Sequence, residues 1–78
     1  MPTVTVRFWA GAQRAAGHES ETLEATTIED LRETLAARKE LTNVCAAASF
    51  LIDGQAAGEN SRLFEGATVD VLPPFAGG

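Results

Sequence analysis

A single amphipathic helix limits what this chain can fold into. In residues 27–39, "TIEDLRETLAARK", the apolar residues Ile28, Leu31 and Leu35 recur at helical spacing and form one stripe. No second stripe of this length occurs in the 78 residues. The helix therefore has to cover one face of a sheet built from the remaining segments, which predicts an α+β fold.

Two overlapping signals mark the beginning of this helix. Thr27 is followed three residues later by Asp30, and Thr26 by Glu29, so either threonine can serve as the N-cap of a capping box. The Arg38-Lys39 pair is expected in the last turn, where positive charge complements the helix dipole. The Glu and Arg side chains on the face opposite the stripe are interpreted as solvated surface.

Short segments of alternating polarity supply the strands. "TVTVRFW" (3–9) places Val4, Val6 and Phe8 on one face, and "ATVDVLP" (67–73) places Val69 and Val71 on one face. These first and last strands are the most apolar, so we expect them side by side in the middle of the sheet. Two further strands are predicted in "HESETLEA" (18–25), which is more exposed, and in "ASFLIDG" (48–54).

The connections carry turn signals. The Asp53-Gly54 dipeptide predicts a tight hairpin, whose second arm opens "QAAGENSRLFEG" (55–66), a loop with a turn of helix. "AGAQRAAG" (10–17) predicts a short helical turn that ends at Gly17. "ELTNVCAAA" (40–48) is compatible with a further short helix.

This order of elements predicts a β-grasp, the ubiquitin-like arrangement of a mixed sheet covered by one long helix. The C-terminus then leaves a central strand and projects as a flexible tail. We expect one domain over residues 1–72 and a tail over residues 73–78.

Charge and hydropathy exclude several functions. A net charge of −5 argues against nucleic-acid binding, which needs a basic face. No apolar run approaches the ~18 residues that span a bilayer, so no membrane contact is predicted. The first residues, "MPTVTVRF", have neither a basic segment nor an apolar signal core, and a cytoplasmic protein is expected.

Side-chain chemistry is sparse. Cys45 is the single cysteine and His18 the single histidine, too few for a zinc site, so no metal is expected. Cys45 is interpreted as a packed interior residue and His18 as a solvated one. No catalytic triad, metalloprotease motif or phosphate-binding glycine loop is present.

The C-terminal "VLPPFAGG" (71–78) is the most informative segment. Gly77 and Gly78 have no side chains, so a narrow channel in another protein can admit them. Residues 73–78 span about 20 Å when extended. The prolines at 73 and 74 restrict two φ angles and favour an extended path. Phe75 either anchors a partner or folds back on its own domain.

The chain resembles the prokaryotic ubiquitin-like sulfur carriers, and among them the small subunit of molybdopterin synthase. The resemblance covers essentially the whole chain. It rests on "VTVRFWAGAQRAAG", "TIEDLRETL", "SFLIDG" and, most specifically, "VLPPFAGG". Gln13 and Ala67-Thr68 depart from the residues that the family often has, arginine and Asp-Glu.

The resemblance implies a function for the C-terminal carboxylate. An ATP-dependent activating enzyme would adenylate Gly78, sulfur transfer would give a thiocarboxylate, and the synthase large subunit would use it on a pyranopterin precursor. This chain itself would bind no cofactor, and two copies would join the large subunit in a heterotetramer. The resemblance assigns partner binding to Pro73, Pro74, Phe75, Ala76 and Gly77, and to Phe8 and Leu63, unless these last two lie in the core.

Other functions remain open at the level of sequence. A carrier for thiamine thiazole or cysteine synthesis needs the same chemistry, although the segment at 38–47 and "PPF" favour the molybdopterin branch. A ubiquitin-like modifier, whose tail forms an isopeptide bond with lysine, needs the same Gly-Gly end.

Overall fold

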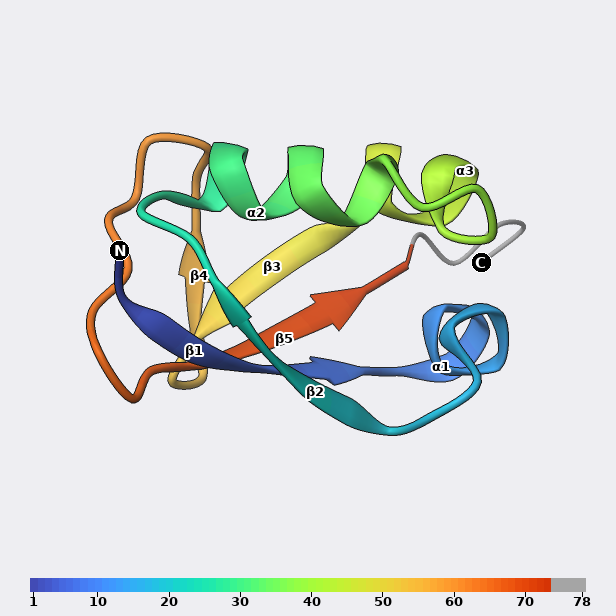
Figure 1. Ribbon diagram of the computed structural model, residues 1–78, viewed down its shortest axis with the longest axis horizontal. Coiled ribbons are helices and arrows are strands. Elements are labelled where there is room, and N and C mark those ends of the chain that lie inside the picture. Colours follow the sequence, from blue (N-terminus) through green and yellow to red (C-terminus); the bar gives the residue numbers. More distant parts are fainter. Residues whose placement is uncertain (74–78) are drawn as a thin grey trace.

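The computed structural model describes residues 1–73, and these form a mixed sheet with helices on one face and at one end (Figure 1). The predicted β-grasp fold is confirmed. The elements are β1 (Thr3–Phe8), α1 (Ala10–Ala16), β2 (Ser20–Glu24), α2 (Ile28–Ala36), α3 (Thr42–Ala46), β3 (Ser49–Ile52), β4 (Gln55–Ala57) and β5 (Thr68–Leu72).

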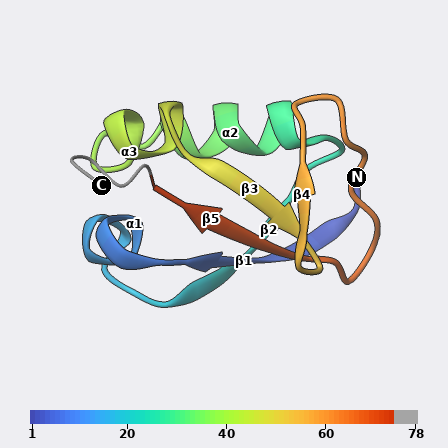
Figure 2. The same cartoon turned by 180° about the vertical axis from the view of Figure 1, so that it is seen from behind.

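The first and last strands lie together in the middle of the sheet, as predicted. The strand order is β2-β1-β5-β3-β4, with β1 and β5 parallel and the other neighbours antiparallel. Val6 pairs with Val69 and Phe8 with Val71 across the central pair. A view from behind shows β5 running between β1 and β3 (Figure 2). Neighbouring parallel strands need a long crossover connection. Here the segment between β1 and β5 is that connection, and it carries α2 across one face of the sheet.

Thr27 is the N-cap of α2, which settles the choice between the two capping signals. Its side-chain hydroxyl accepts a hydrogen bond from the Asp30 backbone N–H at 3.1 Å. The Asp30 carboxylate accepts one from the Thr27 N–H at 3.3 Å, completing a capping box. The register places Ile28, Leu31 and Leu35 in the core with no exposed surface.

The prediction for the end of α2 is wrong. The helix ends at Ala36, so Arg38 and Lys39 lie beyond its last turn. The hydroxyl of Thr42, at the beginning of α3, donates to the carbonyl oxygens of Ala36 at 2.7 Å and Arg38 at 2.9 Å. These bonds satisfy carbonyl groups at the end of the helix and turn the chain into α3.

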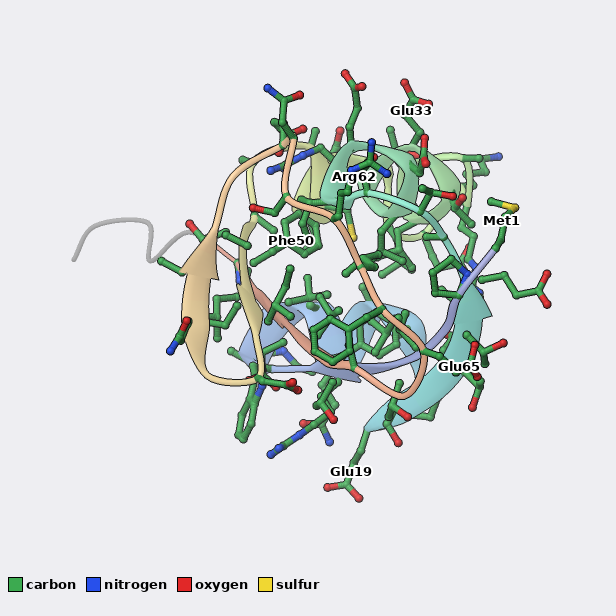
Figure 3. All side chains as sticks on the ribbon, turned by 90° about the vertical axis from the view of Figure 1, so that its left-hand side faces the viewer. Met1, Glu19, Glu33, Phe50, Arg62 and Glu65 are labelled. Carbon is green, nitrogen blue, oxygen red and sulfur yellow. The ribbon has the colours of Figure 1, made fainter. Side chains whose placement is uncertain are left out.

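The interpretation of the α2 face opposite the apolar stripe as merely solvated is also wrong, because Arg32 on this face makes structural contacts. Its guanidinium Nη1 donates to three backbone carbonyl oxygens, two in the last turn of α3 and one just before β3, and Nη2 pairs with the Glu59 carboxylate at 2.7 Å. The guanidinium carbon lies 4.7 Å from the centroid of the Phe50 ring. Phe50 itself points between helix and sheet (Figure 3). Arg32 therefore ties α2 to three other segments. The three carbonyls belong to Cys45, Ala46 and Ala48, at 2.8, 3.1 and 2.9 Å.

The segment before β3 forms the short helix α3, which the sequence allowed. Leu41, the N-cap of α3, and Cys45, within the helix, are fully buried. Burial raises the pKa of the Cys45 thiol, which keeps it protonated and unreactive. The interpretation of Cys45 as an interior packing residue is confirmed.

The predicted hairpin at Asp53-Gly54 is confirmed. Both residues have positive φ, 48° and 87°, and Ile52 pairs with Gln55 across the turn. This is the geometry of a two-residue type I′ connection, which glycine in the second position favours. Within residues 58–67 the predicted turn of helix does not form, and the chain follows an irregular path to β5.

Candidate functional site

The carboxyl end of β5 is the place where the C-terminal segment leaves the domain. Leu72 pairs with Ser49 of β3, while the Trp9 backbone N–H donates to the Val71 carbonyl at 3.3 Å. The strand is thus held on its β1 side up to Val71 and on its β3 side up to Leu72. Pro73 is the last described residue, so the predicted roles of Pro74, Phe75, Ala76, Gly77 and Gly78 lie outside the described residues.

A polar cluster around Trp9 lies beside this exit. The indole Nε1–H donates to Asp70 Oδ1 at 3.0 Å, and the Arg7 Nε lies 3.5 Å from the same oxygen. The Arg7 guanidinium carbon is 4.8 Å from the centroid of the Trp9 ring, a cation–π distance. The ring is therefore fixed in orientation, although 41% of the residue remains exposed.

Trp9 lies on the sheet face opposite α2, which we call the outer face. Arg7 of β1 and Asp70 of β5 are register partners on this face, as are Leu51 of β3 and Asp70. Leu51 and Leu72 are half-buried there. Apolar surface therefore continues from the middle of the sheet to the residues that precede the tail.

The assignment of Phe8 and Leu63 to a partner surface is wrong for the folded domain, and the alternative of a core position is confirmed. Phe8 is 2% and Leu63 6% exposed. Phe8 alternates with Val4 and Val6 and so faces the helices. The backbone N–H of Leu63 donates to the Thr26 carbonyl at 2.8 Å, and its side chain belongs to the buried core cluster. Among residues 1–73, Trp9 is the exposed aromatic residue at this end of the sheet.

Sequence reasoning missed the role of Trp9 although a signal was present. The alternation in β1 that turns Phe8 inward turns the next residue outward. A large aromatic residue on the exposed phase of a strand has no packing role in the core. The contribution of Asp70 carried no such signal, because it depends on the register between β1 and β5.

An ionic cluster joins β2 to the turn after α2. Glu21 accepts hydrogen bonds from the Arg38 guanidinium, one of them at 2.6 Å, and the His18 ring nitrogen Nε2 lies 2.7 Å from Glu21 Oε1. The hydrogen bond from Arg38 is the largest influence on the Glu21 carboxyl and holds its pKa below the ordinary value. The His18 ring also packs edge-on against Phe8, 5.7 Å between centroids. His18 is exposed, as predicted, and also contacts Glu21 and Phe8.

A shallow hollow of about 430 Å³ lies at the opposite end, beside β4. The half-exposed Phe64 forms part of its wall. Its one ionisable residue is Asp53, whose carboxylate accepts a hydrogen bond from the Thr68 N–H at 2.9 Å and supports the hairpin. This arrangement stabilises a turn and offers no acid–base pair for catalysis.

None of the helices within residues 1–73 combines the length and the apolar character needed to cross a membrane. The exit surface consists of the side chains of Trp9, Leu51 and Leu72, beside the end of β5. The sequence predicts that the reactive group is the Gly78 carboxylate, at the end of the segment that follows this surface.

A single long helix over a mixed sheet, with the last strand in its centre, defines a ubiquitin-like β-grasp protein. The chain belongs to the ThiS family of ubiquitin-like sulfur carriers, whose model matches residues 6–78. No curated protein sequence is significantly similar to the chain.

Solved structures share the fold at low sequence identity. Small archaeal modifier protein 1 from Methanosarcina acetivorans is 23% identical with a TM-score of 0.83, covering 100% of this chain and 98% of that one. A chain from the complex of subunits 1 and 2 of the molybdopterin-converting factor of Helicobacter pylori is 23% identical with a TM-score of 0.75, covering 97% and 99%. Urm1 from Trypanosoma brucei is 19% identical with a TM-score of 0.61, covering 97% and 95%.

Proposed function

We propose that this chain is the sulfur-donor subunit of a molybdopterin synthase. Its Gly78 carboxylate is adenylated, becomes a thiocarboxylate and supplies sulfur to a pyranopterin precursor held by the large subunit. The chain performs no catalysis by itself and binds no cofactor, because ATP and the catalytic side chains belong to its partners. The proposal builds on its membership of the ThiS family.

The position of β5 is the observation that supports this function best. The strand is paired with β1 up to Val71 and with β3 up to Leu72, so the residues that follow begin at a rigid point. Five residues remain after Pro73, and in extended form they reach about 17 Å. Their last two residues are glycines, which present backbone alone to a narrow channel.

The chemistry needs activation, because a carboxylate is a poor electrophile. Attack of the Gly78 carboxylate oxygen on the α-phosphate of ATP forms an acyl adenylate and releases pyrophosphate. Sulfide, supplied by the activating system, then attacks the carbonyl carbon, the bond from that carbon to the AMP oxygen breaks, and AMP leaves. The resulting thiocarboxylate carries its sulfur to the precursor.

The partner surface in this proposal is the exit surface of Trp9, Leu51 and Leu72. A partner that encloses the Gly78 carboxylate within about 17 Å of Pro73 has to approach the end of β5. Trp9 lies there, oriented by its hydrogen bond to Asp70, and aromatic residues of this kind are frequent hot spots. The solved complex of molybdopterin-converting factor subunits supports a two-subunit assembly of this kind.

Intact-mass spectrometry of the chain co-purified from its native cell tests the proposal. A fraction heavier by the mass difference between sulfur and oxygen, together with a bound synthase large subunit, is the expected result. Unmodified protein bound instead to a thiazole synthase or a cysteine synthase contradicts it and assigns the chain to one of those pathways.

Deletion of Gly78 separates the tail chemistry from the fold. The deletion should abolish thiocarboxylate formation while the free energy of unfolding stays unchanged. Leu35→Ala is the opposite case: the side chain is fully buried, and its truncation should cost about 2–5 kcal/mol of stability. Restoration of molybdenum-cofactor synthesis by the Gly78-deleted chain would show that the terminal carboxylate is not the sulfur carrier.

A protein-modifier function is the second candidate. It is favoured by the likeness in fold to small archaeal modifier protein 1. Both functions begin with an activated Gly78 carboxylate, and they differ in the nucleophile that receives it. An isopeptide-linked conjugate in cell extracts, absent after Gly78 deletion, would establish the modifier function.

A further inference from the structure

Lys39 differs chemically from every other basic residue of the chain. It is the single lysine; the other basic residues are five arginines and one histidine, and neither type carries an amine. A guanidinium stays protonated in proteins and is a poor nucleophile, whereas a lysine amine attacks electrophiles once it is deprotonated. The amines of this chain are therefore the Lys39 Nζ and the amino group of Met1.

Lys39 is exposed in the turn between α2 and α3. The turn is ordered by the Thr42 hydroxyl, which bonds the carbonyls of Ala36 and Arg38. The neighbouring Arg38 side chain is occupied by Glu21. Within residues 1–73, none of the ion pairs involves the Lys39 amine. Its amine is thus presented to solvent from a fixed turn.

This turn lies at the end of the molecule where β5 finishes, whereas the N-terminus lies at the other end (Figures 1 and 2). The domain measures 33 Å along its longest axis and 22 by 18 Å across it. Because both lie at the same end of the long axis, the distance between Lys39 and Pro73 is limited by the width of the domain and not by its length. The five residues that follow Pro73 reach about 17 Å when extended, a distance comparable with that cross-section. The amino group of Met1 is separated from the exit by the long axis.

We propose that the Lys39 Nζ is an acyl-acceptor site for the activated Gly78 carboxyl of the same chain or of a second copy. The inference rests on the proposed function only in requiring activation of Gly78 by an ATP-dependent adenylating enzyme. The neutral amine attacks the carbonyl carbon of the acyl adenylate, a C–N bond forms, and the bond from carbon to the AMP oxygen breaks. AMP leaves and the amine proton passes to solvent.

The product is an isopeptide at one defined position. It has consequences for either candidate function. In a sulfur carrier it consumes the carboxyl group and removes the chain from sulfur transfer. In a modifier it joins copies of the chain through a single type of linkage, because the chain offers a single lysine.

The test uses the full chain prepared as a Gly78 thioester of a small thiol, so that no activating enzyme is needed. The protein is incubated at mildly alkaline pH until the thioester is consumed, and the products are identified by intact mass and peptide mapping. The expected product is an isopeptide at Lys39, either as a monomer that has lost the thiol or as a dimer. Hydrolysis alone, or an amide at the Met1 amino group, would overturn the inference.

Lys39→Arg is the matched control, because it keeps the charge and exposure and removes the nucleophile. Its thioester should only hydrolyse. The double variant Lys39→Arg/Arg62→Lys moves the amine to the exposed loop between β4 and β5, at the end away from the exit (Figure 3). Among the monomeric products we expect about ten-fold less amide in this variant, because within one chain the tail brings the carboxyl to the other end. Equal acylation at position 62 would overturn the argument from placement.

The outcome is independent of the sulfur-carrier proposal. An isopeptide at Lys39 in the thioester experiment stands even if no thiocarboxylate is found in the native cell. A thiocarboxylate found in the cell, with no isopeptide from the thioester, supports the carrier function and overturns the acceptor site.

Discussion

The indole Nε1–H of Trp9 donates a hydrogen bond to Asp70 Oδ1 at 3.0 Å. This bond joins the residue after β1 to the middle of β5, two residues before that strand ends. Arg7 lies over the ring and also pairs with Asp70. The exposed aromatic residue nearest to the tail is thus held in one orientation before any partner arrives, which lowers the entropy cost of binding.

Trp9→Ala should weaken binding to the protein that receives the tail. Loss of a pre-oriented aromatic anchor costs about 2 kcal/mol, or roughly 30-fold in Kd. Isothermal titration calorimetry with the synthase large subunit measures the effect. Thr5→Ala, an exposed residue of the same strand and face but farther from the exit, should leave Kd within about two-fold. Equal affinities of the Trp9→Ala chain and the original chain would remove Trp9 from the partner surface.

Asp70 allows the orientation of Trp9 to be tested separately from its presence. Asp70→Asn keeps an oxygen that accepts the indole hydrogen bond, whereas Asp70→Leu removes it. Because the chain has one tryptophan, its fluorescence reports on this residue alone. We expect a shifted emission and a weaker complex for Asp70→Leu, and values near those of the original chain for Asp70→Asn.

Arg32→Met should destabilise the domain by about 2–3 kcal/mol, because carbonyl groups at the end of α3 and just before β3 lose their donor. The methionine keeps much of the apolar contact with Phe50, so the loss reports mainly on the hydrogen bonds. Urea unfolding monitored by circular dichroism measures it. Glu33→Gln is the control: Glu33 is exposed on the same helix and points away from the domain (Figure 3), and its change should stay within about 0.5 kcal/mol.

Much of the fold could be predicted from the sequence because its signals are local. The capping box at Thr27, the Asp53-Gly54 turn and the alternating valines of β1 and β5 each act within a few residues. Arg32 could not be predicted in this way. Its partners are backbone carbonyls 13, 14 and 16 residues away, and a backbone carbonyl leaves no trace in the sequence.

The residues of the candidate site also differ in whether a local sequence signal could predict them. The alternation of β1 places Phe8 with the buried valines, and this local signal was correct where the family resemblance suggested a partner surface. The cluster of Arg7, Trp9 and Asp70 depends on the parallel register of strands more than sixty residues apart in the sequence. Such a pairing is fixed only when the helix and both strands have packed together.

Ala10→Gly should stabilise the domain by about 0.5–1 kcal/mol. Ala10 has φ of 47°, a left-handed conformation that is costly for alanine and easy for glycine. This residue turns the chain from Trp9 into α1. Thermal unfolding measures the change. Ala15→Gly, in the same helix, should instead lose about 1 kcal/mol, since glycine is unfavourable in a helix interior. Destabilisation by Ala10→Gly would show that the turn is not strained.

The Glu21–Arg38 pair should make stability depend on acid. The hydrogen bond from Arg38 lowers the pKa of the folded Glu21 carboxyl below its ordinary value of 4.5. A group with a depressed folded pKa contributes stability above its unfolded pKa and loses it as the pH falls through the folded one. The free energy of unfolding should therefore fall between about pH 5 and the folded pKa, and this part of the fall should be absent in Glu21→Gln.

His18→Gln is the control for this pH dependence. Arg38 is the largest cause of the shift, so the acid-induced loss should persist when the imidazole is removed. Urea titrations at a series of pH values from 3 to 7 compare the three proteins. A profile of Glu21→Gln that parallels the original chain throughout this range would show that the pair adds no stability, because the protonation of Glu21 would then be the same in the folded and unfolded states.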